Sequence, residues 1–176
     1  RAIGDHRGLL RLRLGEAGIP EDQGTIIALE FGPEARRLAA RFRGGGLVVW
    51  DLEKQRVLFS HDIDRHRRQA SRPRFNADGR FIVAAIFRPQ DGMAVFETDT
   101  GRQVAFFPEF SSFRHAAPRP GAPMFAANDG TNVVVVNWET RERLAIIPFL
   151  PGVRRMAWSP DGAYLAIGGG AVEVYL

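Results

Sequence analysis

The stretch WSPDGAYLAIGGGAVEVYL, residues 158–176, combines two turns with two short strand-like runs. In Ser-Pro-Asp-Gly, residues 159–162, proline supplies the fixed φ that starts a turn and glycine supplies the positive φ that ends it. Residues 163–167 and 171–176 are short runs of mainly apolar and aromatic residues bounded by glycine, which is typical of strands. The stretch therefore predicts two neighbouring strands, and it stops where a sheet would need one more.

The same pattern occurs earlier in the chain. Phe31-Gly-Pro-Glu-Ala-Arg36 and Phe75-Asn-Ala-Asp-Gly-Arg80 each place an aromatic residue before a turn, and apolar strands follow at 37–42 and 81–87. A degenerate copy has Ala117-Pro-Arg-Pro-Gly121 where the aromatic residue and the Asp-Gly pair would stand.

A second element also repeats: a strand, a polar turn and another strand, at 47–58, 94–104 and 135–144. Taking Leu58, Val104 and Leu144 as equivalent gives spacings of 46 (104 − 58) and 40 (144 − 104) residues. Repeats of this length with four strands each are characteristic of propeller blades.

On these residues the chain resembles WD-repeat β-propellers from about residue 8 to residue 176. Trp50-Asp51 reproduces the dipeptide that names the family, and its Gly-His partner is absent. Without that partner, we expect apolar packing rather than an Asp-His-Ser-Trp network to hold the blades together. Evenly spaced strands also fit an antiparallel sandwich, which remains the alternative fold.

We therefore predict a single all-β domain, a β-propeller or partial propeller of four-stranded antiparallel blades. The expected parts are a strand at 8–14 and blade units at 25–61, 72–107, 113–148 and 153–176, the last with three strands. Leu9–Leu14 is the candidate strand to complete the last blade, because ring closure removes exposed edges. Three arrangements remain open: a closed four-bladed ring, two chains forming an eight-bladed ring by edge-strand pairing, and a segment of a larger propeller.

Composition limits the class of protein. The 176 residues are 45% hydrophobic, carry a formal charge of +4 and include no cysteine, which excludes disulfides and thiolate metal sites. No apolar run is long enough to span a membrane. Of 24 basic residues only Lys54 is lysine, a bias that points to a high-GC bacterial genome. The composition favours the cytoplasm and leaves the periplasm open.

The strongest charged feature is residues 65–74, RHRRQASRPR, with five arginines, one histidine and no acid. It falls in a loop between an outer and an inner strand, on the rim where members of the resembled family commonly bind partners. Arginine binds carboxylates and phosphates through two parallel hydrogen bonds, so we expect an acidic segment of another protein here. The predicted partner-binding residues are Arg65, His66, Arg67, Arg68, Arg72, Arg88 and Arg114. A solvated basic loop is the alternative reading.

Other chemistries receive little support. Nucleic-acid binding would need exposed aromatic residues among the basic ones, whereas the aromatic residues here occupy strand positions typical of a core. These are Phe75, Phe81, Phe96, Trp138 and Trp158. Residues 61–66, HDIDRH, could begin a metal site but nothing completes it, and 128–132, NDGTN, lacks the length of a calcium loop.

The sequence contains no nucleophile elbow, phosphate-binding loop or zinc-binding helix. We therefore predict no catalytic residues, no metal and no cofactor. The predicted function is a non-catalytic protein–protein interaction or scaffold module that presents a propeller rim. The alternative is a propeller enzyme or small-ligand sensor that uses the mouth of the central channel.

Overall fold

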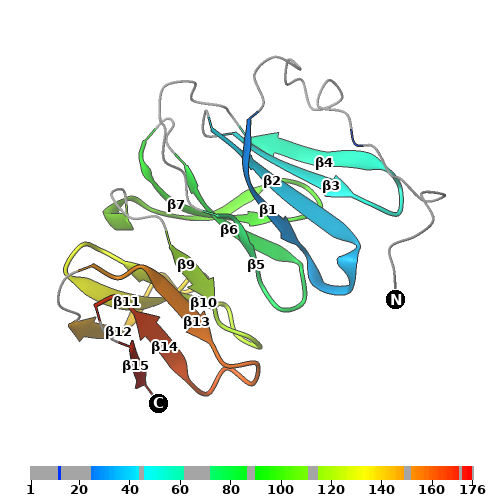
Figure 1. Cartoon of the computed structure of the whole chain (residues 1–176). Helices are drawn as coiled ribbons and strands as arrows, with labels where there is room; N and C mark the ends of the chain where they lie inside the picture. Colours follow the sequence, from blue (N-terminus) through cyan, green and yellow to red (C-terminus); the bar gives the residue numbers. More distant parts are fainter. Residues whose placement is uncertain are drawn as a thin grey trace.

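A computed structural model of the chain shows an arrangement of antiparallel sheets (Figure 1). The structure describes residues 12, 25–43, 46–61, 72–86, 90–110, 115–148, 152–170 and 172–175. Within them there are three four-stranded sheets and one three-stranded sheet, which we call blades 1 to 4 in chain order.

Each blade contains consecutive strands paired in chain order. Blade 1 comprises β1 (Ile26–Phe31), β2 (Arg37–Phe42), β3 (Leu47–Asp51) and β4 (Arg56–His61). Blade 2 comprises β5 (Arg74–Phe75), β6 (Phe81–Ile86), β7 (Gly92–Glu97) and β8 (Gln103–Phe107). Blade 3 comprises β9 (Ala116–Pro118), β10 (Met124–Asn128), β11 (Asn132–Asn137) and β12 (Arg143–Pro148), and blade 4 comprises β13 (Arg155–Trp158), β14 (Leu165–Gly168) and β15 (Val172–Tyr175). Two short 3-10 helices, η3 (Pro33–Ala35) and η4 (Pro108–Phe110), lie between strands.

The blades are arranged as in a β-propeller. The first strand of each blade is its inner strand, and β1 contacts β5, β5 contacts β9, and β9 contacts β13. Figure 1 shows blade 1, in blue to cyan, and blade 4, in orange to red, at opposite ends of this succession. The predicted fold class is therefore confirmed, and the antiparallel sandwich is not what forms.

The repeat alignment made from the sequence holds at single-residue precision. In each four-stranded blade the pairing of the third and fourth strands shifts by one residue: Trp50 pairs with Val57, Phe96 with Gln103 and Val136 with Arg143. The residues skipped by these shifts are Leu58, Val104 and Leu144, the three that define the spacings of 46 and 40. A β-bulge thus recurs at the same place in every complete blade.

The turns between the first and second strands also follow the predicted pattern. Gly79 and Gly162 both have φ of +72°, and the backbone N–H of Ser159 donates to Tyr164 O at 2.8 Å to close the last of these turns. The Asp161 carboxylate accepts hydrogen bonds from the Ser159 hydroxyl and the Ala163 N–H, which lower the pKa of that carboxyl. Ser-Pro-Asp-Gly therefore forms its turn through side-chain as well as backbone contacts.

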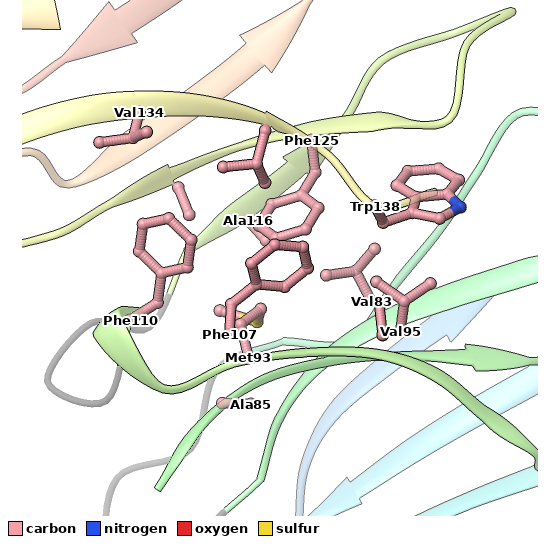
Figure 2. Close-up of a cluster of buried hydrophobic side chains, with 13 residues drawn as sticks. Val83, Ala85, Met93, Val95, Phe107, Phe110, Ala116, Phe125, Val134 and Trp138 are labelled. Atoms are coloured by element: carbon pink, nitrogen blue, oxygen red, sulfur yellow. The ribbon is translucent and has the colours of Figure 1, made fainter. Parts of the chain in front are cut away.

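Apolar clusters lie between neighbouring blades, as expected for blades held by packing. The largest cluster joins blades 2 and 3, and Figure 2 shows Phe107 of β8 and Phe125 of β10 between Phe110 of η4 and Trp138. A second cluster joins blades 1 and 2, and a third joins blades 3 and 4. Among the aromatic residues assigned to the core, Phe96 and Trp138 are buried, whereas Phe75, Phe81 and Trp158 are half-buried and pack against the clusters.

Arginines also link neighbouring blades. Arg41 is fully buried and donates to Ala85 O of blade 2 at 2.7 Å, and desolvation lowers its pKa to about 10. Arg37 donates to Gly79 O at 3.3 Å, and Arg119 donates to Gly162 O at 2.9 Å. Each of these arginines donates to a backbone carbonyl of the next blade, so the contacts fix neighbouring sheets to one another.

The described residues contain no helix long and apolar enough to cross a membrane. The predicted strand at Leu9–Leu14 lies outside the described residues except for Leu12, which packs against Ala40, Phe42, Val48 and Trp50 of blade 1. Its role in completing the last blade stays a prediction.

Candidate functional site

Basic side chains from three blades gather where the inner strands begin. Arg74 is the first residue of β5, and Arg155 is the first residue of β13. Arg72 stands two residues before Arg74, and His115 immediately precedes β9. Together these four residues, which we call the basic mouth, line a cavity of about 110 Å³ with Ala116 and Met156.

Contacts to three residues hold Arg74 and Arg155 in the basic mouth. Arg74 Nη1 lies 3.1 Å from both carboxylate oxygens of Glu30 in blade 1. Arg155 Nη1 lies 3.1 Å from His115 Nε2 and donates to the Arg154 carbonyl at 2.7 Å. Since a guanidinium has only donors, this contact is a hydrogen bond in the tautomer in which Nε2 of His115 accepts and Nδ1 carries the proton.

The charge balance of this cavity is positive. The three arginines carry three positive charges, and the one acid that contacts them in the described residues, Glu30, removes one. Arg72 and Arg155 are exposed and hold no ion pair with an acid among the described residues. No acid among the described residues neutralises these two guanidinium groups, and the contacts of Arg155 given above involve Nη1 alone.

The size of the cavity limits what can enter it. Sites for small molecules and cofactors usually occupy 300–1,000 Å³. A volume of about 110 Å³ is smaller than that range and suits one carboxylate or phosphate group at the end of a longer chain. The cavity formed by the described residues of the basic mouth thus matches the size of a single anionic group.

The structure places one of the predicted partner-binding residues, Arg72, in this cavity. Arg65, His66, Arg67, Arg68, Arg88 and Arg114 lie outside the described residues. Sequence reasoning missed His115 and Arg155, which are remote from the basic segment in the chain. Their position in the repeat could have identified them. Arg155 is the first residue of an inner strand, as Arg74 is, and His115 immediately precedes one.

A larger notch, which the sequence analysis did not predict, lies between blades 2 and 3 on the opposite rim. Its volume is about 400 Å³, and turn residues line it, including Asp78, Arg80, Trp138 and Glu139. Trp138 Nε1 is buried without a hydrogen-bond partner among the described residues, and Figure 2 shows this nitrogen turned away from the apolar cluster. The notch is therefore lined by side chains of both charges, Asp78, Arg80 and Glu139, beside the Trp138 ring.

The suggested metal site is not assembled in the described part of the chain. Of residues 61–66 only His61 is described, and its ring packs against Phe96 with centroids 5.0 Å apart. The described residues contain no group of three histidine, cysteine or acidic side chains placed to hold a metal ion.

No family model matches the sequence, and no curated protein does. Solved structures do resemble the fold. U3-55K matches with a TM-score of 0.69 and 15% identity, over 87% of this chain and 49% of that one. The WD40 repeats of RRP9 match with a TM-score of 0.69 and 16% identity, over 87% and 48%. Kuenenia stuttgartiensis hydrazine synthase matches with a TM-score of 0.65 and 14% identity, over 84% and 57%.

These similarities establish the fold: the chain has a β-propeller fold like that of solved WD40-repeat structures. It spans about half the length of the structures that it matches. One of them is named as an enzyme, so the fold is shared by enzymes and by proteins named for WD40 repeats.

Proposed function

We propose that the chain is a protein-interaction module whose basic mouth binds an acidic segment of another protein. The observation that carries the proposal is the convergence of Arg72, Arg74, His115 and Arg155 from three blades on one small cavity. Arginine pairs with carboxylates through two parallel hydrogen bonds, which suits an Asp or Glu side chain entering from the rim.

The dimensions of the site favour this function over catalysis. An enzyme or small-ligand sensor would need a pocket that encloses its ligand, whereas a cavity of about 110 Å³ accepts one anionic group. The similarity to WD40-repeat structures also supports an interaction role. Members of the WD-repeat family commonly bind partner proteins on a rim of the propeller. The basic residues at 65–68, 88 and 114 would extend the surface, and that part stays a prediction.

The test compares two double variants that remove the same charge. Arg72→Ser with Arg155→Ser should weaken binding of a labelled Glu/Asp-rich peptide roughly tenfold, since each exposed charge contact contributes up to about 1 kcal/mol. The matched control, Arg36→Ser with Arg102→Ser, removes two exposed arginines from turns on the opposite rim, and binding should be nearly unchanged. Fluorescence anisotropy at several salt concentrations measures both.

Three further probes define the outcome. The same peptide with Gln and Asn in place of Glu and Asp should not bind, because it lacks the carboxylates that pair with arginine. Equal weakening by both double variants would show that net charge alone attracts the peptide. Stronger binding of a phosphopeptide or of single-stranded DNA than of the acidic peptide would also contradict the proposal.

A further inference from the structure

On the rim that carries the turns between first and second strands, a guanidinium group bridges two of the junctions between described blades. At the junction of blades 1 and 2, Arg37 of blade 1 donates to Gly79 O at 3.3 Å and to Asp99 Oδ1 at 2.5 Å. At the junction of blades 3 and 4, Arg119 of blade 3 donates to Gly162 O at 2.9 Å. In both places an arginine of the earlier blade binds the turn of the later blade.

The junction of blades 2 and 3 carries equivalent acceptors. The strand pairings give the turns one length, so Ala122 occupies in blade 3 the position of Gly79 in blade 2 and of Gly162 in blade 4. Glu139 occupies the position of Asp99, because the same backbone hydrogen bonds close the turns that contain them. Ala122 and Glu139 both line the notch of about 400 Å³ between these blades.

The arginine that binds such acceptors at the other two junctions is replaced here. Phe81 begins β6 as Arg37 begins β2, and Asn76 follows β5 as Arg119 follows β9. Arg80 lines the notch, but its guanidinium carbon lies over the Phe81 ring, 5.7 Å from the centroid. Within the described part of the chain, no arginine of blade 2 donates to the acceptors of blade 3.

The charge and the size of the notch suit a guanidinium from outside. Asp78 and Glu139 contribute two negative charges and Arg80 contributes one positive charge, so the side chains that line the notch carry one net negative charge. The volume of about 400 Å³ is free with the Arg80 side chain in place, and ligand pockets usually have about 300–1,000 Å³. The notch therefore has room for a complete arginine side chain beside Arg80.

Aromatic rings supply a further contact for a cation. Phe81 and Trp138 line the notch with their ring centroids 5.7 Å apart, and Figure 2 shows Trp138 at the end of the cluster between blades 2 and 3. A guanidinium is attracted to the face of such a ring. The chain uses this contact itself, because the guanidinium carbon of Arg119 lies 5.3 Å from the centroid of the Trp158 ring while it donates to Gly162 O.

We infer that the notch between blades 2 and 3 binds an arginine side chain of a partner protein. The guanidinium would donate to the Ala122 carbonyl and the Glu139 carboxylate and lie against the rings of Phe81 and Trp138. Ala122 O already accepts from the Met124 N–H at 2.8 Å, and a carbonyl oxygen has a second lone pair. This surface lies on the rim opposite the basic mouth, so it is separate from the proposed site for an acidic segment.

NMR of the ¹⁵N-labelled chain with the blocked peptide acetyl-Gly-Arg-Gly-amide tests the inference. The backbone signals of Trp138 and Glu139 should shift with a Kd on the order of 1 mM, because exposed ion pairs contribute little. The same peptide with citrulline in place of arginine should leave these signals unchanged, since its urea group has the shape of a guanidinium without the charge. The lysine peptide should bind at least about threefold more weakly, because an ammonium lacks the planar fork of donors.

Two glutamine variants locate the contact. Glu139→Gln should raise the Kd of the arginine peptide about threefold. The matched control, Glu142→Gln, removes the same charge from the same turn outside the notch and should leave the Kd unchanged. Phe81→Arg should block the peptide, because it places an arginine of the chain where Arg37 stands at the junction of blades 1 and 2.

Four results would overturn the inference. They are no shift at about 10 mM arginine peptide, equal weakening by both glutamine variants, equal binding of the citrulline or lysine peptide, and tighter binding of free arginine than of the blocked peptide. The last result would assign the notch to a small molecule rather than to a protein side chain.

Discussion

Replacing Phe125 with alanine is expected to lower the free energy of unfolding by about 3–5 kcal/mol. Phe125 in β10 is fully buried, and its ring lies 5.3 Å from that of Phe107, 5.9 Å from that of Phe110 and 6.5 Å from that of Trp138 between centroids. Because these rings come from blades 2 and 3, truncation would leave a cavity at the junction of two blades (Figure 2).

Chemical denaturation monitored by far-UV circular dichroism measures this effect. The control is Val172→Ala in β15 of blade 4, a side chain that is 77% exposed and belongs to neither blade of this junction, so the change should stay within about 0.5 kcal/mol. Equal losses for the two variants would mean that the junction of blades 2 and 3 does not contribute the packing assigned to it.

The blade pattern was predictable because its determinants are local. A turn needs proline and glycine at set positions, and a strand needs a short apolar run, so both can be recognised within a few residues. The third unit shows why the repeat can be recognised although the sequence of its first turn is degenerate. Pro118 stands where Phe75 and Trp158 stand in their blades, yet it pairs with Phe125 in the same register. The length of the turn, rather than its composition, preserves the repeat.

The basic mouth was only partly predictable because it is built from three separate blades. Charge clustering along the sequence singled out the segment that contains Arg72, since its basic residues are adjacent in the chain. His115 and Arg155 stand near that segment only after blades 2 to 4 have stacked around their inner strands. A search for basic residues at the start of each inner strand would have found them.

The roles of the arginines inside the fold were likewise hidden from the sequence. Arg41 lies in the strand Arg37–Phe42, whose sequence is RLAARF, and nothing in that sequence shows that its guanidinium is buried. Its hydrogen bond to Ala85 O depends on the position of blade 2, which local rules do not specify. The arginine-rich composition therefore supplies contacts between blades.

Replacing Gly101 with alanine should destabilise the chain by about 2–5 kcal/mol, through two separate causes. Gly101 follows β7 in the turn toward β8 and has φ of +70°, where an L-residue costs roughly 1–2 kcal/mol. In addition, a Cβ there would lie 2.6 Å from both Cβ and Cγ of Phe59 in β4 of blade 1. Because the Cβ of Phe59 is fixed to its strand, the clash would push blades 1 and 2 apart, and overpacking of this kind costs about 1–3 kcal/mol.

Gly121 provides a control that isolates the second cause. It also has φ of +70°, but a Cβ added there meets no atom within 4 Å. Gly121→Ala should therefore lose only the backbone contribution, and the difference between the two alanine variants reports the contact between Gly101 and Phe59. In Gly101→Ala, shortening Phe59 to alanine as well should reduce the clash, because the ring atoms beyond Cβ are then gone. Equal destabilisation by Gly101→Ala and Gly121→Ala in denaturant melts would show that blades 1 and 2 do not meet at this turn.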